Sequence, residues 1–566
     1  MQTWKISAGV GLASLGFLTA CGGGNDGLPQ LTPAQAGTLA NCTTLASSFA
    51  FANTTIDAAT VVSEGTLKNA GTPIGEHCAV TGKMNRRTSA VDGQTYAIGF
   101  EMRLPKAWNG RLLYQANGGT DGVVSQAVGG FVGGGPLHNA LQQGFAVISS
   151  DAGHSATQNP LFGLDPQARL DYGYMAVGTL TPMAKGLIKA AFGKGPDRSY
   201  IGGTSNGGRH SMVAASRYAS EYDGFLAIAP GFNLPKAAVA QLYGAQQWAK
   251  VATDPANLET ALPQAERKLI ANAILTKCDA LDGASDGLVQ DMDACQSAFD
   301  LARDVPTCTG DRNGSCLTPA QKTAIGNVYA GARNTKGDAL YARWSYDPGI
   351  SQTGWADWKF RNAVGAARDP VAVAFIFSSP PESTSILSNT LGYALNFNFD
   401  TDAPKIFATS GIYTESAMSF MTPPNPTQLD GVRNKGGKLL VIHGSSDPVF
   451  SVDDTTNWYQ SLNARYGGNA AEFTRFFRVP GMGHSRGGPA TDQFDALTAL
   501  VNWVEKGEAP DSILAAARGA GNAGGVNAEL PASWSATRTR PLCAYPKVAR
   551  FKGTGDIESA GSFHCQ

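Results

Sequence analysis

Short apolar segments alternate with helical patterns along most of the chain, and this alternation restricts the possible folds more than any other feature. Strands are expected at residues 96–104, 111–115, 144–150, 200–201, 224–229, 438–443 and 473–479, and helices at 175–192, 207–222, 455–464 and 492–506. Strands that alternate with helices form a largely parallel sheet that is covered on both faces. The sequence therefore predicts an α/β fold.

The pattern changes between residues 232 and 425, where Trp, Pro, Gly and Asn are frequent and the strand–helix alternation fades. Neither end of this segment has the composition of a linker. We therefore expect residues 232–425 to form a domain inserted into an α/β domain. The α/β domain would comprise residues 38–231 and 426–566.

The composition excludes several classes of protein. Of the 566 residues, 43% are hydrophobic and 16% are charged, which is too apolar for a disordered chain. The 44 basic and 45 acidic residues nearly cancel and no basic block is present, so nucleic-acid binding is not expected. The 68 glycines and 30 prolines follow no fixed period, which excludes collagen and indicates a loop-rich enzyme.

The N-terminus has the features of an export signal. Lys5 precedes an apolar stretch, residues 6–20, that is too short and too glycine-rich for a membrane span. Its ending, Leu18-Thr19-Ala20-Cys21, resembles the bacterial lipoprotein box, in which the cysteine is lipidated. We predict a signal peptide at residues 1–21, a lipid anchor at Cys21 in the outer membrane, and a linker at 22–37. The alternative is an ordinary signal peptide of a periplasmic or secreted protein.

Eight cysteines remain after Cys21, and an even number in an exported chain indicates disulfides. None has CxxC spacing, so a zinc site is not expected. Proximity in the sequence favours the pairs Cys42–Cys78, Cys278–Cys295, Cys308–Cys316 and Cys543–Cys565.

The sequence Gly203-Thr204-Ser205-Asn206-Gly207 has the G-x-S-x-G pattern between a predicted strand and a predicted helix. A sharp turn in this position presents a serine hydroxyl above the sheet, and the flanking glycines leave room for it. We therefore expect Ser205 to be a nucleophile. The alternative is a purely structural turn.

A serine hydroxyl is a weak nucleophile and needs a base. His484 is the preferred base because it lies just after the predicted strand 473–479, where a loop can place its ring above the sheet. His154 follows a strand and could line the site, whereas His210 could be a core or capping residue of the helix after the serine. His77 and His564 adjoin cysteines and are expected in structural or surface positions, and His138 lies in a glycine-rich loop.

Asp447 follows the predicted strand 438–443 and is expected to orient the imidazole of His484. Asp453 and Asp454 are rivals, although they could instead cap the next helix. The order Ser205, Asp447, His484 is that of α/β-hydrolases.

The developing oxyanion needs two donors. One is expected to be the amide of Asn206, directly after the nucleophile. The other is expected in the glycine-rich loop 117–122, where Gly119 is the best candidate because glycine allows the backbone close to a substrate.

A second group of polar residues lies between Asp279 and Leu288. Asp279, Asp282 and Asp286 alternate with glycines in a short loop, a pattern that suits calcium but is not an EF-hand. An acidic surface loop without metal is an equal alternative.

Several long stretches resemble the tannase/feruloyl esterase family of α/β-hydrolases, and in particular its bacterial members that hydrolyse mono(2-hydroxyethyl) terephthalate. The resemblance covers almost the whole mature chain and is strongest at residues 162–174, 278–288, 405–410, 481–495, 507–511 and 537–545. It implies an α/β-hydrolase fold with a large lid domain inserted between the nucleophile and the acid.

The resemblance also implies roles for particular residues. It supports the triad of Ser205, Asp447 and His484 and an oxyanion hole of Gly119 and Asn206. It implies structural calcium, held by Asp279, Asp282 and Asp286 and by the carbonyls of Ala284 and Leu288. It suggests that the pocket for an aromatic acyl group is formed by Leu234, Trp355, Phe377, His443 and Phe450.

Two departures from the family stand out. The family usually has a disulfide between the residues before the nucleophile and after the base, but Thr204 and Ser485 occupy these positions. We predict a noncovalent contact there and a more mobile His484 loop. In addition, no lid arginine aligns in register to bind the carboxylate of a terephthalate half-ester, although Arg361 and Arg368 are candidates.

These features predict a serine carboxylesterase for small aromatic esters of the feruloyl, galloyl or mono(2-hydroxyethyl) terephthalate type. It would need no organic cofactor, would bind no nucleic acid, and would contact the membrane only through its lipid anchor. The alternative is a surface lipoprotein that binds aromatic ligands without turnover.

Overall fold

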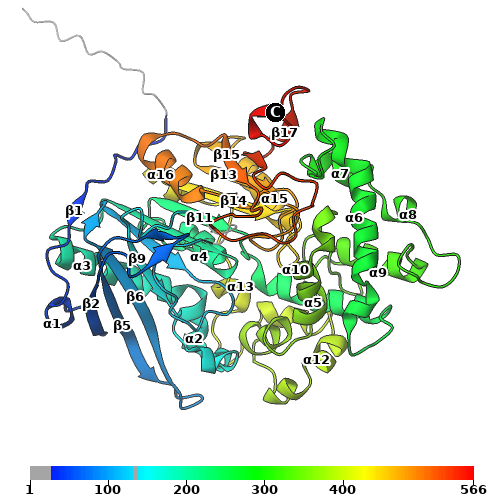
Figure 1. Cartoon of the computed structure of the whole chain (residues 1–566). Helices are drawn as coiled ribbons and strands as arrows, with labels where there is room; N and C mark the ends of the chain where they lie inside the picture. Colours follow the sequence, from blue (N-terminus) through cyan, green and yellow to red (C-terminus); the bar gives the residue numbers. More distant parts are fainter. Residues whose placement is uncertain (1–26, 132–136) are drawn as a thin grey trace, which may run out of the picture.

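The computed structural model describes residues 27–131 and 137–566 (Figure 1). The predicted signal peptide, the anchor at Cys21 and the first residues of the predicted linker lie outside the described residues. From residue 27 the chain follows the protein surface. The Gln30 side chain donates to the Val504 carbonyl (2.8 Å), and β1 (Gly37–Thr38) pairs with β7 (Ala107–Trp108). These hydrogen bonds attach Gln30 and Gly37 of the predicted linker to the body.

A nine-stranded sheet forms the centre of the molecule. Its strands are β2 (Thr54–Val62), β5 (His77–Thr88), β6 (Thr95–Pro105), β8 (Arg111–Ala116), β9 (Ala146–Ser150), β10 (Arg198–Thr204), β11 (Gly224–Ile228), β12 (Lys438–Gly444) and β13 (Thr474–Val479). The order is β13-β12-β11-β10-β8-β9-β6-β5-β2. In this order the six strands from β13 through β8 to β9 are parallel to their neighbours. The strands β9, β6, β5 and β2 pair antiparallel with one another. The α/β prediction is confirmed, but the sheet is mixed.

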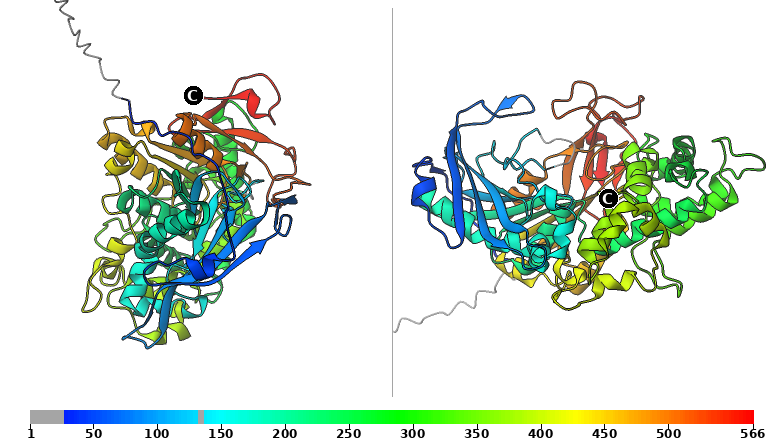
Figure 2. Two further views of the ribbon diagram at one scale, coloured as in Figure 1. Left: turned by 90° about the vertical axis from the view of Figure 1, so that its left-hand side faces the viewer. Right: turned by 90° about the horizontal axis from the view of Figure 1, so that it is seen from below.

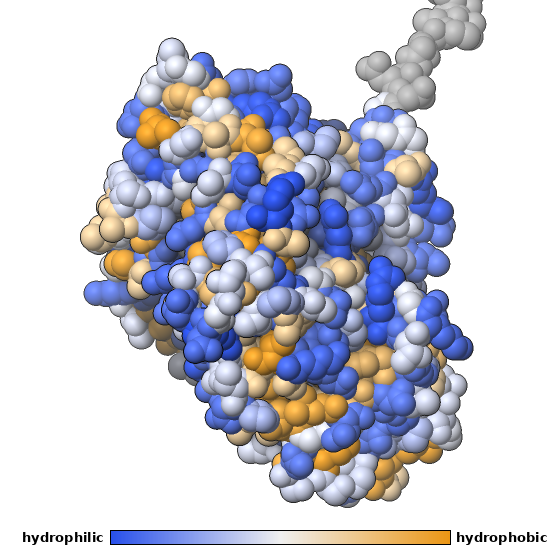
Figure 3. Space-filling view, turned by 90° about the vertical axis from the view of Figure 1, so that its right-hand side faces the viewer, coloured by the Kyte–Doolittle hydropathy of each residue, from blue (hydrophilic) through white to orange (hydrophobic). Residues whose placement is uncertain are grey.

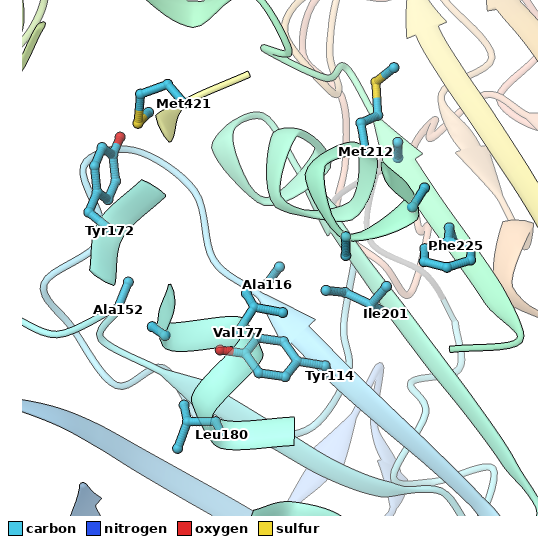
Figure 4. Close-up of a cluster of buried hydrophobic side chains, with 14 of the residues drawn as sticks. Tyr114, Ala116, Ala152, Tyr172, Val177, Leu180, Ile201, Met212, Phe225 and Met421 are labelled. Carbon is cyan, nitrogen blue, oxygen red and sulfur yellow. The ribbon is translucent and has the colours of Figure 1, made fainter. Parts of the chain in front are cut away.

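Helices cover both faces of the sheet. One face carries α3 (Ala176–Phe192), α4 (Asn206–Arg217) and α15 (Val452–Arg465), and the other carries α16 (Ala496–Lys506). Because strand side chains alternate between faces, Tyr114 and Ile201 pack toward α3 and α4, as Figure 4 shows, while their neighbours Leu113 and Tyr200 pack toward α16. α16 begins later than predicted because Asp495 caps it.

Residues 232–425, the inserted segment, lie between β11 and β12 and add no strand to the central sheet. Its helices are α5 (Leu234–Ala249), α6 (Gln264–Cys278), α7 (Met292–Ala298), α8 (Leu301–Asp304), α9 (Pro319–Tyr329), α10 (Thr353–Ala356), α11 (Asp369–Val371), α12 (Thr390–Asn396) and α13 (Ala417–Phe420). They enclose a separate apolar core around Trp248 and lie beside the sheet (Figure 2). Polar and apolar residues mix on the outer face of this side of the molecule (Figure 3).

Shorter elements complete the fold. They are α1 (Leu45–Ser48), α2 (Pro166–Leu170), α14 (Asp430–Lys435), β3 (Lys68–Asn69), β4 (Thr72–Pro73), β14 (Gln493–Phe494), β15 (Ser512–Ala516), β16 (Thr539–Cys543), β17 (Ala549–Phe551) and β18 (Phe563–Cys565). Within the described ranges, no helix is long and apolar enough to cross a membrane.

The eight cysteines form the four predicted disulfides, Cys42–Cys78, Cys278–Cys295, Cys308–Cys316 and Cys543–Cys565. Disulfides form and persist in oxidising compartments, so this framework agrees with an exported protein.

Candidate active site

Ser205 lies at the turn between β10 and α4. Its backbone has φ 64° and ψ −122°, a conformation that residues other than glycine rarely adopt. The turn needs glycine on both sides, since a Cβ at Gly203 or Gly207 would lie 2.4 Å or 2.3 Å from the Ala116 carbonyl oxygen. The G-x-S-x-G pattern therefore produces a strained turn that exposes a serine hydroxyl, as its local context predicts.

Ser205, His484 and Asp447 form a continuous chain of hydrogen bonds. The Nε2 atom of His484 lies 2.8 Å from Ser205 Oγ, and its Nδ1 lies 2.8 Å from Asp447 Oδ2. Such a chain can accept the serine proton while the carboxylate holds the imidazole in place. Asp453 and Asp454 lie in α15 and bind Arg343 and Asn233 instead.

The environment of Asp447 favours its ionised form. Burial by itself raises the pKa of the carboxyl. The charge and hydrogen bond of His484 and the contact with His443 lower the pKa by more than burial raises it, so that it lies below the ordinary value. The amides of Val449 and Phe450 also donate to Asp447 Oδ1. The carboxylate is therefore available to stabilise an imidazolium at His484.

His154 and His210 lie behind the loop of residues 117–122, here called the oxyanion loop after its predicted role. His154 Nε2 is 2.8 Å from the Thr120 carbonyl, and burial lowers its pKa to about 4. His210 Nε2 is 3.0 Å from Asp121 Oδ2. Both rings support the loop, and His484 is the one that contacts Ser205.

The oxyanion loop lies against the nucleophile turn. A Cβ at Gly118 would be 3.8 Å from Ser205 Cβ, and the neighbouring Gly119 has φ +66°. Asn206 is the first residue of α4, so its amide has no carbonyl partner within the helix. Its side chain donates to Asp121 Oδ2 (2.8 Å) and ties the loop to the turn, a contact that sequence reasoning missed.

A cavity of about 590 Å³ opens above Ser205 and His484. Among the predicted pocket residues, Leu234, Phe377 and Phe450 line it. Trp355 and His443 do not. The ring of Trp355 packs on Trp248 and Phe360 in the core of the inserted segment, and His443 is buried behind Asp447.

Trp358 is the tryptophan that reaches the cavity. It lies three residues after Trp355, and its ring meets that of His484 edge-on at 5.8 Å between centroids. Both tryptophans belong to one helical stretch, so a small change in its phase decides which ring faces the cavity.

The two candidate arginines differ in position. Arg368 is exposed, lines the cavity and lies over the ring of Trp358, and among the described residues no hydrogen bond or ion pair engages its guanidinium. Arg361 does not line the cavity and pairs with Asp357 and Glu259. Of the two candidates, Arg368 alone lines the cavity and could bind an anionic group there; Arg486, two residues after His484, lines the same cavity.

The acidic loop 279–288 is folded onto its own backbone amides. Asp279 accepts from the amides of Asp286 and Gly287, and Asp286 pairs with buried Arg540. Asp282 Oδ2 is buried and has no hydrogen-bond partner, and burial raises the pKa of this carboxyl to about 7. Within the described chain, no three acidic, histidine or cysteine side chains converge as a metal-ligand set.

Thr204 and Ser485 both lie at the wall of the cavity. Ser485 is buried, has φ 71°, and its hydroxyl has no hydrogen-bond partner. The predicted noncovalent contact between the two residues and the greater mobility of the His484 loop stay predictions.

Comparisons with known proteins show the family of this chain. The family model described as "Tannase and feruloyl esterase" matches residues 78–566. The mono(2-hydroxyethyl) terephthalate hydrolase of Piscinibacter sakaiensis is 40% identical over 525 residues, covering 87% of this chain and 85% of that protein. A probable feruloyl esterase B-2 of Aspergillus fumigatus is 27% identical over 504 residues, covering 86% and 87%.

Solved structures support the fold. Feruloyl esterase B from Aspergillus oryzae aligns with a TM-score of 0.70 at 24% identity, covering 92% of this chain and 98% of that one. Another esterase from the same organism aligns with a TM-score of 0.72 at 23% identity, covering 93% and 99%.

Proposed function

Because the chain belongs to the tannase/feruloyl esterase family and is a carboxylic ester hydrolase, we propose that it works through an acyl-enzyme on Ser205. The observation that carries this proposal is the unbroken chain of hydrogen bonds from Ser205 through His484 to Asp447. The alternative, a lipoprotein that binds aromatic ligands without turnover, is not favoured, since the relatives are esterases.

The reaction would proceed in two halves. Ser205 Oγ attacks the ester carbonyl while His484 Nε2 takes its proton, and Asp447 stabilises the imidazolium. The amides of Gly119 and Asn206 stabilise the tetrahedral oxyanion. His484 then protonates the leaving alcohol, and a water molecule activated by the same ring hydrolyses the acyl-enzyme.

The cavity supports an aromatic acyl group. Phe377, Phe450 and Trp358 offer ring surfaces, and an aromatic substrate packs well against such walls. Arg368 supplies a positive charge at the same wall, which favours an acyl group with a second, free carboxylate. We therefore infer that the substrate is a half-ester of an aromatic dicarboxylic acid, with feruloyl and galloyl esters as the second candidates.

We also propose structural calcium in loop 279–288, with ligands from Asp279, Asp282 and Asp286 and from the carbonyls of Ala284 and Leu288. Binding would require Asp279 to turn from the backbone amides, and Asp286 from Arg540, toward the ion. The buried, unpartnered Asp282 Oδ2 supports this proposal, because a buried carboxylate oxygen needs a cation or a donor. Calcium would neutralise the loop and hold its fold. No step of ester hydrolysis needs it.

Export as a lipoprotein anchored at Cys21 remains part of the proposal. Four disulfides support export, while the anchor rests on the sequence of the lipoprotein box.

Active-site labelling tests the proposed chemistry. An aryl phosphonate ester should modify the wild-type chain once, on Ser205, and peptide mass spectrometry locates the adduct. Ser205→Ala should remain unmodified. Labelling of another serine, with Ser205 unmodified, would refute the acyl-enzyme.

A further inference from the structure

A buried aspartate of the inserted segment contacts two loops, the one that carries Asp447 and the one that carries His484. Asp347 is 3% exposed and lies just before residues 348–351 of the inserted segment. Its Oδ2 accepts from the hydroxyl of Ser445 (2.5 Å), and its Oδ1 accepts from the hydroxyl of Ser446. Gly349 and Gly481 also donate their amides to this carboxylate, at 2.9 Å and 3.4 Å.

The positions of these donors in the chain matter. Ser445 and Ser446 directly precede Asp447, in the acid loop of residues 445–450. Gly481 lies three residues before His484, in the base loop of residues 480–488. The amide of Gly481 also donates to Ser445 Oγ (2.7 Å), so that the hydroxyl links the two loops beside the carboxylate.

A second side chain of the inserted segment fills the base loop. Gln352 Nε2 donates to the Gly481 carbonyl (2.8 Å). A Cβ at Gly483 or Gly488 would lie 2.4 Å or 2.0 Å from the amide group of Gln352. The base loop is therefore packed closely around this residue.

We propose that Asp347 is a positioning residue, which fixes the acid loop against the base loop and so sets the distance between Asp447 and His484. The inference rests on the proposed function. Thr204 and Ser485 cannot form a disulfide in this chain, so hydrogen bonds from the inserted segment hold the base loop. Displacement of a catalytic group by about 1 Å can lower turnover on the order of 10²-fold, which makes this support important.

Asp347→Asn tests the inference. The amide nitrogen of asparagine cannot accept a hydrogen bond, so at least one of the two serine hydroxyls loses the acceptor for its proton while the size of the side chain is kept. We expect kcat to fall about 10- to 100-fold, with KM changed by less than about threefold. The acid limb of the kcat/KM profile should move to lower pH, because a displaced Asp447 stabilises the imidazolium less.

Asp223→Asn is the matched control. Asp223 is also a buried aspartate: it accepts from the Ser199 amide (2.8 Å) and pairs with Lys435 (3.0 Å), but it lies at the start of β11, away from the triad loops. Both variants should lower the melting temperature, whereas only Asp347→Asn should lower kcat and shift the pH profile. Ser446→Ala is the milder variant if Asp347→Asn does not fold, and its kcat should fall several-fold.

The outcomes are distinguishable. An unchanged kcat and pH profile in Asp347→Asn, or in Ser446→Ala, would overturn the positioning role. An equal loss of kcat in Asp223→Asn would do the same, because it would reflect general destabilisation. If the wild-type chain hydrolyses no ester in a way that is lost in Ser205→Ala, the proposed function is wrong, and this inference fails with it.

Discussion

Arg368 lies beside Gly119, its Nη1 atom 3.8 Å from the position that a Cβ would take at this glycine. The arginine belongs to the inserted segment, whereas Gly119 belongs to the α/β domain. A charged side chain of the inserted segment thus lies beside the glycine-rich loop at the wall of the cavity. In the proposed mechanism the segments on either side of the insertion supply the reacting groups, and the inserted segment supplies Leu234, Trp358, Arg368 and Phe377 to the cavity wall.

Arg368→Ala should separate acidic from neutral substrates. A charge-assisted hydrogen bond contributes about 1.5–3 kcal/mol, so kcat/KM for mono(2-hydroxyethyl) terephthalate should fall about 10- to 100-fold. For methyl ferulate, which has no second carboxylate, it should change by less than about threefold. Steady-state kinetics on both substrates measure the difference.

Arg361→Ala is the control for this prediction, since Arg361 is exposed and pairs with Asp357 and Glu259 away from the cavity. Its kinetics should match the wild type. Equal losses on both substrates in Arg368→Ala would contradict a carboxylate-binding role.

Asp447 should remain ionised throughout the useful pH range, because its pKa lies below the ordinary value of an aspartate. Because Asp447 takes up no proton in this range, we expect log kcat/KM to fall with a slope of one on the acid side of the profile. A slope of two there would mean that Asp447 also becomes protonated.

Removal of the Asp447 charge should be severe. Asp447→Asn keeps the shape but presents the wrong hydrogen-bond pattern to His484, so kcat should fall on the order of 10⁴-fold. A loss of less than about tenfold, measured with the same ester, would argue that Asp447 is not the acid of the triad.

Asn206 should contribute through its side chain as well as its amide. Asn206→Ala leaves the backbone donor but removes the bond to Asp121 Oδ2 and leaves a buried carboxylate short of a partner. We expect a loss of stability of about 1–3 kcal/mol and a lower kcat. Asn233→Ala, which removes a comparable bond to Asp454, should lower stability alone. Unaltered kcat in Asn206→Ala would disprove the role of this contact.

Calcium should stabilise the chain without taking part in hydrolysis. At saturating calcium the melting temperature should rise by about 5 °C relative to chelated protein, while kcat of the folded enzyme stays unchanged. Asp282→Ala should remove the rise, and Asp311→Ala, at an exposed aspartate outside the loop, should keep it. Identical melting curves with calcium and with chelator would exclude the site.

Short-range sequence patterns were enough to predict those parts of the fold that are set by neighbouring residues. The parallel strands, the turn at Ser205 and the paired cysteines each have a short-range signal. β2 was missed because its sequence, TTIDAATVV, has no regular alternation of polar and apolar residues, and only Ile56, Ala59 and Val62 among its apolar residues are partly buried. The antiparallel half of the sheet therefore has a weaker apolar pattern than the parallel half.

The missed site residues depend on contacts between distant parts of the chain. The choice between Trp355 and Trp358 needs the phase of one helical stretch against the cavity. Asp347 lies 98 residues before Ser445 and has no motif around it, so only the folded chain brings them together. Long-range polar contacts of this kind have no periodicity that a sequence can reveal.

The most direct test of the central claim is hydrolysis by the purified wild-type chain and by Ser205→Ala. The substrates are mono(2-hydroxyethyl) terephthalate, methyl ferulate and methyl gallate. We predict turnover by the wild type, with the terephthalate half-ester preferred, and a fall of kcat on the order of 10⁴-fold or more in Ser205→Ala. Equal rates in the two proteins would contradict the account, because ester hydrolysis would not depend on Ser205.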